Sequence, residues 1–489
     1  MTHSKLPGSK RVISSSTAIS AIRRAGRSTR NGRRCSASSW RRCTIGSAEA
    51  LLSSSLTLKT LGHASIALYR DGAAPLLLTD PWLIGSVYWR SWWLQHYSDQ
   101  AELDWLAGAA NVYITHEHPD HFHTPSIRRL GKQPLYLFPA LPELGFVAYL
   151  RDQGFRTEII PPATWRRLDN GVSILSLPLW NDDSLLLVDT PEALILNFND
   201  AKPPPPVVTA VRRLADRIAK PRILLASYSP ASLVNSFSAA AGERVSLKAP
   251  EGYVGFICRL CERLAADIYL PFASQASFER VDSEWANHYR TGYADLERLW
   301  RGPTRLLPPY TTLALADLSH RATPPDCYRP AAAARRAART AERLAEEGAA
   351  AIDTTDAARL QRKLNLWRWL FWPLFPRGFA FEAGGRALVY EPRRGQVRIA
   401  PSGDYGDFVV SVPALTLKEA LANDHLSDLG ITMFVRIRLL RAIDPRKVYG
   451  LFVLFQFDDY GHMRRPRALL RWIGRGLRRS LPFRLPLPN

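Results

Sequence analysis

The sequence is poor in cysteine and has no long apolar run, and each shortage excludes a class of protein. Its five cysteines are scattered along 489 residues, which excludes the disulfide framework of a small secreted domain. Cys258 and Cys261 form a lone C-x-x-C in a helical-looking segment, where core packing is expected. No stretch reaches the roughly eighteen apolar residues of a spanning helix. A cytoplasmic protein is expected, with peripheral membrane contact as an alternative.

Acidic residues are also scarce, above all near the N-terminus. The formal net charge is +21, and Met1 to Cys43 contains eleven Lys and Arg and no acid. This leader has no hydrophobic period, so residues 1–54 are expected to be disordered, as a flexible basic arm, a transit peptide or a start-site artefact. Because the middle of the chain is much less basic than its ends, nucleic acid is not an expected partner.

The sequence does contain a dense group of histidines and acids after a short apolar run. Ile114 to His123 reads ITHEHPDHFH, with four histidines and two acids in ten residues. Pro119 limits helix here, so these side chains can converge only in a sharply turning loop. Imidazole and carboxylate suit zinc, iron or manganese. The segment therefore predicts a site for one or two divalent metal ions, with zinc favoured over iron or manganese.

This H-x-H-x-D-H pattern resembles the signature of the metallo-β-lactamase superfamily. Within it, the chain is most similar to the hydrolase-like domain of the CMP-N-acetylneuraminate hydroxylase group. The similarity runs from about Leu56 to Tyr310 and includes Leu61-Gly62-His63-Ala64-Ser65, Asp80-Pro81-Trp82-Leu83, Trp92-Trp93-Leu94 and Leu196-Asn197-Phe198-Asn199-Asp200. That group also carries a Rieske domain, whose paired C-x-H and C-x-x-H ligands are missing here. No iron–sulfur cluster and no monooxygenase chemistry are therefore expected.

The resemblance implies roles for individual residues. His116 and His118 would bind one metal ion. Asp120 and His121 would bind a second ion or hold the nucleophilic water, with Asp120 as the catalytic residue that orients it. Asp200 would bridge the two ions.

Two further residues are expected around these ligands. Asp80 occupies the first acid position of the family pattern, where it would accept a ring N–H from a ligand and fix its tautomer. His63 would line the pocket, with a buried core histidine as the equal alternative.

Two positions of the family pattern lack their histidine. The third-ligand histidine would follow the middle strands, where the chain reads Leu179 to Ser184, and Asp182 or Asp183 is expected in its place. The last strand of the family domain often ends in a ligand histidine. Ile268 to Ser274 has none, unless His288 folds back.

The periodicity predicts an α+β protein whose main domain, residues 55–310, is a four-layer αββα sandwich. Thr124-Pro125 reads as a helix start behind the metal loop, and another helix is expected over Val207 to Ile218. Strand-like runs occur at Leu56–Leu61, Ser65–Tyr69, Pro75–Thr79, Val112–Thr115, Leu135–Phe138, Val172–Leu177, Leu185–Val188 and Ala193–Asn197.

An α+β accessory domain is expected over residues 311–463. Helices are predicted from Ala331 to Gly348 and from Thr355 to Leu370. Strand-like runs follow at Ala387–Glu391, Gln396–Ala400, Phe408–Val412 and Val448–Phe457. A lid, a dimer contact or a membrane-docking unit would all fit this order. The Trp-rich stretch Trp367 to Phe375 is expected to end the long helix and pack between domains, with an interfacial anchor as the alternative.

Residues 464–489 are expected to form a basic amphipathic tail. Apolar residues and arginines recur there at helical spacing, so one face is apolar and the other cationic. Such a helix lies on an anionic membrane surface or packs on its own domain, and Gly474 and Gly476 weaken it.

Together these features predict a metal-dependent hydrolase whose metal-bound hydroxide attacks an ester, lactone or phosphodiester in a small-molecule substrate. One alternative is a non-hydrolytic binding protein with a degenerate metal site, because of the missing histidines. Another is a peripheral-membrane lipid-processing hydrolase, because of the Trp-rich stretch and the basic tail.

Overall fold

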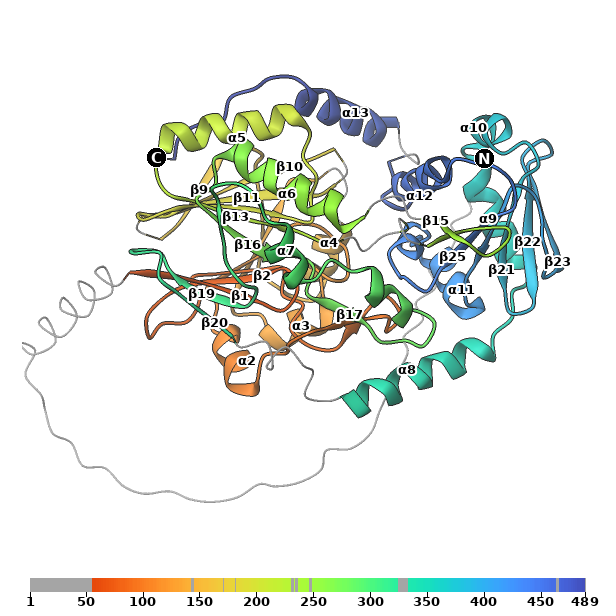
Figure 1. Ribbon diagram of the computed structural model, residues 1–489, viewed down its shortest axis with the longest axis horizontal. Helices are drawn as coiled ribbons and strands as arrows, with labels where there is room; N and C mark the ends of the chain where they lie inside the picture. Colours follow the sequence, from red (N-terminus) through yellow and green to blue (C-terminus); the bar gives the residue numbers. More distant parts are fainter. Residues whose placement is uncertain are drawn as a thin grey trace, which may run out of the picture. The chain divides into compact units, whose positions relative to one another are not determined.

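The computed structural model describes residues 55–488, apart from 142–144, 170, 181, 230–232, 234–235, 246–248, 324–332 and 463–465. The expected basic leader, residues 1–54, lies outside the described residues. Two large sheets with covering helices come mainly from the first part of the described chain, and a third sheet comes mainly from the second part (Figure 1).

Within the described residues, the first large sheet has eight strands in the order β20-β19-β1-β2-β3-β6-β7-β8. They are β1 (Leu56–Leu61), β2 (Ser65–Arg70), β3 (Leu77–Thr79), β6 (Asn111–Tyr113), β7 (Leu135–Pro139), β8 (Thr157–Ile160), β19 (Thr311–Ala314) and β20 (His320–Ala322). Three helices cover one face of this sheet, α2 (Gln100–Ala107), α3 (Thr124–Leu130) and α4 (Gly145–Asp152). Apolar residues of these helices join those of β3, β6 and β7 in one buried cluster.

The described part of the second large sheet has seven strands in the order β18-β16-β13-β12-β11-β10-β9. They are β9 (Trp165–Asp169), β10 (Val172–Pro178), β11 (Ser184–Asp189), β12 (Leu194–Asn199), β13 (Arg222–Ser227), β16 (Ile268–Phe272) and β18 (Arg305–Leu306). Helices α5 (Pro205–Ile218) and α6 (Pro250–Leu264) cover its outer face, and α7 (Tyr293–Leu299) packs beside α6. β10, β11 and β12 are buried along their whole length, because both of their faces are covered.

Three buried clusters separate the four layers. One lies between helices α2 to α4 and the first sheet, one between the two sheets, and one between the second sheet and helices α5 and α6. The predicted αββα sandwich is therefore confirmed, and the strands expected from apolar runs between residues 56 and 199 are all present.

The first sheet continues beyond residue 310, where the domain was expected to end. β19 pairs antiparallel with β1, with Ala314 opposite Thr57, and β20 pairs with β19. Without this return, β1 would be an edge strand with unpaired backbone N–H and C=O groups. Both added strands are too short for a period-two pattern to reveal them.

The third sheet combines two stretches that lie far apart in the sequence. Its order is β15-β14-β25-β24-β21-β22-β23. The strands are β14 (Phe237–Ala239), β15 (Arg244–Val245), β21 (Phe379–Ala383), β22 (Arg386–Glu391), β23 (Gln396–Pro401), β24 (Phe408–Ser411) and β25 (Arg436–Leu439). The hairpin of β14 and β15 pairs parallel with β25, and its Phe237 is buried in the accessory core. A small separate sheet contains β4 (Ser86–Val87), β5 (Trp92–Leu94) and β17 (Ala276–Phe278).

The strand expected over Val448–Phe457 is wrong, because this stretch is helix α12 (Pro445–Asp459). The Asp444 carboxylate caps the helix by accepting the Arg446 N–H at 2.9 Å. The aromatic and β-branched composition favoured a strand, but the buried residues follow the helical period. They are Val448, Leu451, Phe452, Phe455 and Asp458.

The other elements of the second half are mostly helical. They are α8 (Ala333–Gly348), α9 (Thr354–Asn365), α10 (Arg368–Leu374), α11 (Ala414–Asn423) and α13 (Pro466–Ser480), with 3-10 turns η2 (Glu284–Tyr289) and η4 (Ser427–Gly430). The helix expected from Thr355 to Leu370 is thus divided into α9 and α10. In the Trp-rich stretch, Trp367, Phe371 and Phe375 are buried in the accessory core, whereas Trp369 and Trp372 are 69% and 51% exposed.

A buried ion cluster ties α8 to the sandwich. Arg280, in the loop after β17, is fully buried and donates from Nη2 to Glu347 Oε2 at 2.6 Å. On α8, Arg343 Nε donates to the same carboxylate at 2.8 Å, and Thr416 on α11 donates at 2.6 Å. Glu347 therefore joins three elements through one side chain. None of the described helices is both long enough and apolar enough to cross a membrane.

Candidate metal centre

The metal loop, residues 114–123, connects the end of β6 to the start of α3. After Pro119 the chain turns sharply, since the backbone N–H groups of His121 and Phe122 both donate to the His118 carbonyl, at 2.9 and 2.7 Å. The helix cap is His123 rather than Thr124, which is the first helical residue. This turn directs His116, Asp120 and His121 inward, where each is at least nine-tenths buried.

Three overlapping groups of side chains converge beside this loop, and in each group the ligand atoms lie within 4.8 Å of one another. His116 Nε2 lies 2.8 Å from His118 Nδ1, 3.9 Å from Asp183 Oδ1 and 4.0 Å from Asp200 Oδ1. Asp200 Oδ1 is also 3.7 Å from His121 Nε2. The loop histidines thus meet acids from two other segments.

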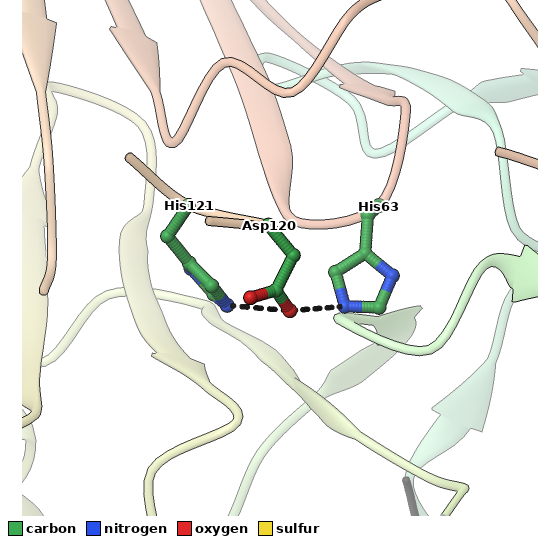
Figure 2. Close-up of side chains that lie close together, drawn as sticks. All are labelled: His63, Asp120 and His121. Atoms are coloured by element: carbon green, nitrogen blue, oxygen red, sulfur yellow. Dashed lines mark ion pairs between the residues drawn. The ribbon is translucent and has the colours of Figure 1, made fainter. Parts of the chain in front are cut away.

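The third group is drawn in Figure 2, with Asp120 between His63 and His121. Asp120 Oδ2 lies 3.3 Å from His63 Nε2 and 3.6 Å from His121 Nε2. Both rings thus present a nitrogen to one carboxylate.

Of the two acids expected to replace the third-ligand histidine, only Asp183 joins the cluster. The carboxylate of Asp182 points to the C-terminal segment instead. Its Oδ1 accepts a 2.5 Å hydrogen bond from Arg475 Nη2, and its Oδ2 is hydrogen-bonded to His462 Nε2. Asp182 has a backbone φ of 65°, so the chain reverses there and directs the two neighbouring carboxylates to different places.

His63 occupies the space beside the end of β16, where the last-strand histidine of the family was expected. Its carbonyl accepts the Ala273 N–H at 2.9 Å. Gly62 makes this turn feasible, because a Cβ at Gly62 would lie 2.6 Å from the Trp82 carbonyl oxygen. His288, by contrast, is exposed on η2 and belongs to none of the candidate groups among the described residues.

Replacing His63 with glutamine is expected to weaken metal binding by at least about a hundredfold, because an amide is a poorer ligand than imidazole. The measurement is a zinc titration of protein first stripped with a chelator. His288→Gln is the matched control and should titrate like the wild type. Equal affinities in the two variants would exclude His63 as a ligand.

Asp80 is fully buried and holds the metal loop through hydrogen bonds to Thr115. Its Oδ1 accepts the Thr115 N–H at 2.7 Å, and its Oδ2 accepts the Thr115 hydroxyl at 2.9 Å. The same Oδ2 lies 3.2 Å from His121 Nδ1. Burial raises the pKa of Asp80 more than His121 lowers it. With Nδ1 facing Asp80, His121 presents Nε2 to the other acids, as the resemblance implies.

The charges of the cluster fit a divalent cation. Among the described residues, the ion-pair partners of Asp120 and Asp200 are histidines. Burial alone would lower the pKa of His121, but Asp120, Asp200 and Asp80 raise it to about 10. His121 Nε2 and Asp200 Oδ1 are buried without a hydrogen-bond partner in the described part of the chain. Because such groups are costly to bury unpaired, a bound cation would stabilise this arrangement.

Two tyrosines that the sequence did not indicate contact the cluster. The Tyr88 hydroxyl donates to Asp120 Oδ1 at 2.6 Å, and the Tyr460 hydroxyl lies 3.0 Å from His118 Nε2. Tyr88, Trp89 and Arg90 all have positive φ, at 49°, 54° and 63°. Backbone strain of this kind is concentrated at functional sites. No short motif marks either tyrosine, and Tyr460 ends the helix that was mistaken for a strand.

Five residues of the cluster line a cavity of about 360 Å³, namely His63, His118, Asp120, Asp183 and Asp200. Tyr88 and Trp92 line it from the sandwich, while Tyr449 and Phe452 line it from α12. Helix α12 therefore forms one wall of the pocket beside the candidate metal ligands.

No family model matches the chain. Its curated relatives include cytidine monophosphate-N-acetylneuraminic acid hydroxylases. The Danio rerio protein is 28% identical over 169 residues, which cover 32% of this chain and 28% of that protein. The Asterias rubens protein is 41% identical over 66 residues, 13% of this chain and 10% of that protein. The inactive Homo sapiens protein is 28% identical over 138 residues, 26% of this chain and 27% of that protein. The chain thus spans less than a third of each relative.

Solved structures give a weaker likeness. The isothiocyanate hydrolase from Delia radicum gut bacteria is 15% identical, with 55% of this chain and 98% of that chain covered and a TM-score of 0.35. The metallo-beta-lactamase fold protein YhfI from Bacillus subtilis is 9% identical, with 52% and 96% covered and a TM-score of 0.30. The two facing sheets between helices and the H-x-H-x-D-H loop between strand and helix are what the resemblance to the metallo-β-lactamase superfamily implies, and part of the chain is similar in sequence to the hydroxylases.

Proposed function

We propose that this protein is a metal-dependent hydrolase of small molecules. The observation that carries the proposal is the convergence of histidines and acids around two buried ligand atoms without a hydrogen-bond partner in the described part of the chain, His121 Nε2 and Asp200 Oδ1, beside a cavity that Asp200 lines. One or two divalent ions held there would lower the pKa of a water molecule and polarise a carbonyl or phosphoryl oxygen. Zinc suits this donor set best, and iron and manganese share its preferences.

Each residue has a proposed task. His116, His118 and Asp183 would hold one ion. His63, Asp120 and His121 would hold the other, and Asp200 would lie between them. Asp120, fixed by the Tyr88 hydroxyl, would orient the attacking water.

The degenerate-site alternative was based on two missing histidines. Asp183 and His63 each belong to a group of side chains that could hold a metal ion, which supports a complete site over a degenerate one.

The cavity favours an anionic substrate among the ester, lactone and phosphodiester classes. Lys202 lines it together with aromatic side chains. Desolvation acts to lower the pKa of the Lys202 ammonium, but neighbouring tyrosines and the acids Asp200 and Asp183 raise it overall. Lys202 is therefore charged at neutral pH, and among the described residues no carboxylate forms an ion pair with it. A phosphodiester, or an ester that carries a carboxylate, would complement this charge.

Lys202→Met is expected to raise KM for an anionic phosphodiester by about tenfold, because it removes one charge-assisted hydrogen bond. KM for a neutral aryl ester should stay near the wild-type value. Initial rates with chromogenic esters of both kinds provide the measurement, and Lys132→Met, at an exposed site on the sandwich, is the control. An equal change for both substrates would refute the anion-binding role of Lys202.

A chelator experiment tests the proposed function itself. Metal-depleted protein should lose hydrolysis of these esters and recover it when zinc, manganese or iron is added back. Protein that stays inactive with every metal, while remaining folded and metal-loaded, would contradict the hydrolase proposal.

A further inference from the structure

The basic tail is anchored to the sandwich along one side of helix α13. Trp472 Nε1 donates to the Trp180 carbonyl at 2.5 Å, and the buried Arg475 donates to Asp182. Beyond the helix, Leu485 is buried against the α5 side of the second sheet. The Trp165 indole donates to the Pro486 carbonyl at 2.8 Å. The described tail is therefore a docked element of fixed orientation.

The opposite side of α13 exposes large apolar residues. We call Leu470, Ile473, Leu477 and Leu481 the α13 outer face. Their exposed fractions are 67%, 40%, 61% and 61%. The intervals of three and four residues put Leu470, Ile473 and Leu477 on one side of the helix axis, and Leu481 directly follows the last helical residue, Ser480. A helix that uses its other side for docking would ordinarily present polar groups here, so this strip needs a partner.

Charge indicates which partner fits. Arg467, Arg471 and Arg478 are exposed on α13. No acidic residue occurs from Pro466 to Asn489. Arginine side chains can extend to lipid headgroups while neighbouring leucines enter the acyl boundary. A second copy of this chain would bring like charges together, which disfavours self-association through this face.

We propose that the α13 outer face docks on an anionic phospholipid bilayer. The leucines and the isoleucine would enter the interface, and the arginines would bind the phosphate and serine or glycerol headgroups. α13 is hydrogen-bonded to Trp180 and to Asp182, and Trp180 lines the cavity. Docking would therefore hold the pocket wall near the bilayer. The proposal rests on the surface alone, so it stands or fails independently of hydrolysis.

The test is co-sedimentation of the full chain with vesicles. Binding is expected with phosphatidylcholine vesicles that contain about a third phosphatidylserine, and much weaker binding with phosphatidylcholine alone. Added salt should weaken it, because exposed charges are screened within about 8 Å at physiological ionic strength. Metal-depleted protein should bind equally well, which separates this result from any failure of the hydrolase proposal.

Two pairs of variants sharpen the test. The double variant Arg471→Glu, Arg478→Glu should reduce binding by about thirtyfold or more, whereas Arg213→Glu, Arg386→Glu makes the same charge change at exposed sites elsewhere. Leu477→Asp should reduce binding by about tenfold, whereas Val281→Asp, at a residue that is 69% exposed, should not.

Three results would overturn the proposal. They are equal binding to neutral and anionic vesicles, wild-type binding by both α13 variants, and a vesicle-free dimer that Leu477→Asp dissociates. The last result, measured by sedimentation velocity, would assign the face to a second copy of the chain. Because the substituted side chains are exposed, thermal unfolding should confirm that each variant remains folded.

Discussion

Replacing both His116 and His118 with alanine is expected to remove the bound metal and to lower ester hydrolysis by at least about a thousandfold. His116 Nε2 belongs to two of the candidate groups, so its loss affects both proposed ion positions. A metal ion contributes several kcal/mol to transition-state stabilisation, and each 1.36 kcal/mol corresponds to tenfold in rate. Elemental analysis and initial rates, on wild type and variant purified in parallel, provide the measurement.

The neighbouring acids Asp182 and Asp183 supply a matched control. Asp183→Asn should reduce metal content, because Asp183 faces His116. Asp182→Asn should retain the metal but lower the thermal stability, because it weakens the contacts of Arg475 and His462. Wild-type protein that remains metal-free after incubation with zinc, manganese or iron would sink the proposed function.

Glu347→Ala is expected to lower the free energy of unfolding by about 3–5 kcal/mol, the usual cost of leaving a buried charge without its partner. The variant would leave Arg280 buried beside Arg343, with Asp282 as the remaining carboxylate on Arg280. Urea titration at neutral pH measures the loss. The double variant Arg280→Met, Glu347→Met should recover much of it, because neither charge is then buried. A loss below about 1 kcal/mol would show that the cluster is solvated.

The contribution of the Glu347 carboxylate to the free energy of unfolding should depend on pH, and the direction of that dependence follows from its pKa. Burial acts to raise the pKa of Glu347, but hydrogen bonds from Arg280, Thr416 and Arg343 lower it below the usual 4.5. Because the pKa of Glu347 is lower in the folded state than in the unfolded state, the carboxylate stabilises the fold at pH values above its unfolded-state pKa. This stabilisation is lost as the pH falls through the folded-state pKa. The difference in unfolding free energy between wild type and Glu347→Ala should therefore shrink below about pH 4.

The parts of the fold that the sequence predicted well are those with strong local signals. Eight strands, β1, β2, β3, β6, β7, β10, β11 and β12, read as short apolar runs, and the metal loop carries its own motif. α12 failed because its composition favoured a strand although its buried positions followed a helical period. β19 and β14 were missed because their pairing partners are distant in sequence.

In the candidate site, too, local patterns were predictive and contacts between distant residues were not. The loop histidines and Asp200 were identified from pattern and resemblance, and they do converge. The choice between Asp182 and Asp183 depended on Arg475, nearly 300 residues later. Whether His63 lines the site or is only a core residue depended on the turn at Gly62, whose close approach to Trp82 is a tertiary contact. Such choices are decided by packing, which local spacing does not record.

The hairpin of β14 and β15 also sets an order of assembly. The ribosome completes this hairpin well before it makes β25, the strand with which β14 pairs. During synthesis the hairpin therefore lacks its pairing strand. Phe237 can be buried in the accessory core only after the chain has been made past Leu439. The pocket wall contributed by α12 is made later still. A nascent chain thus acquires the candidate metal ligands of the loop long before it acquires the pocket wall beside them.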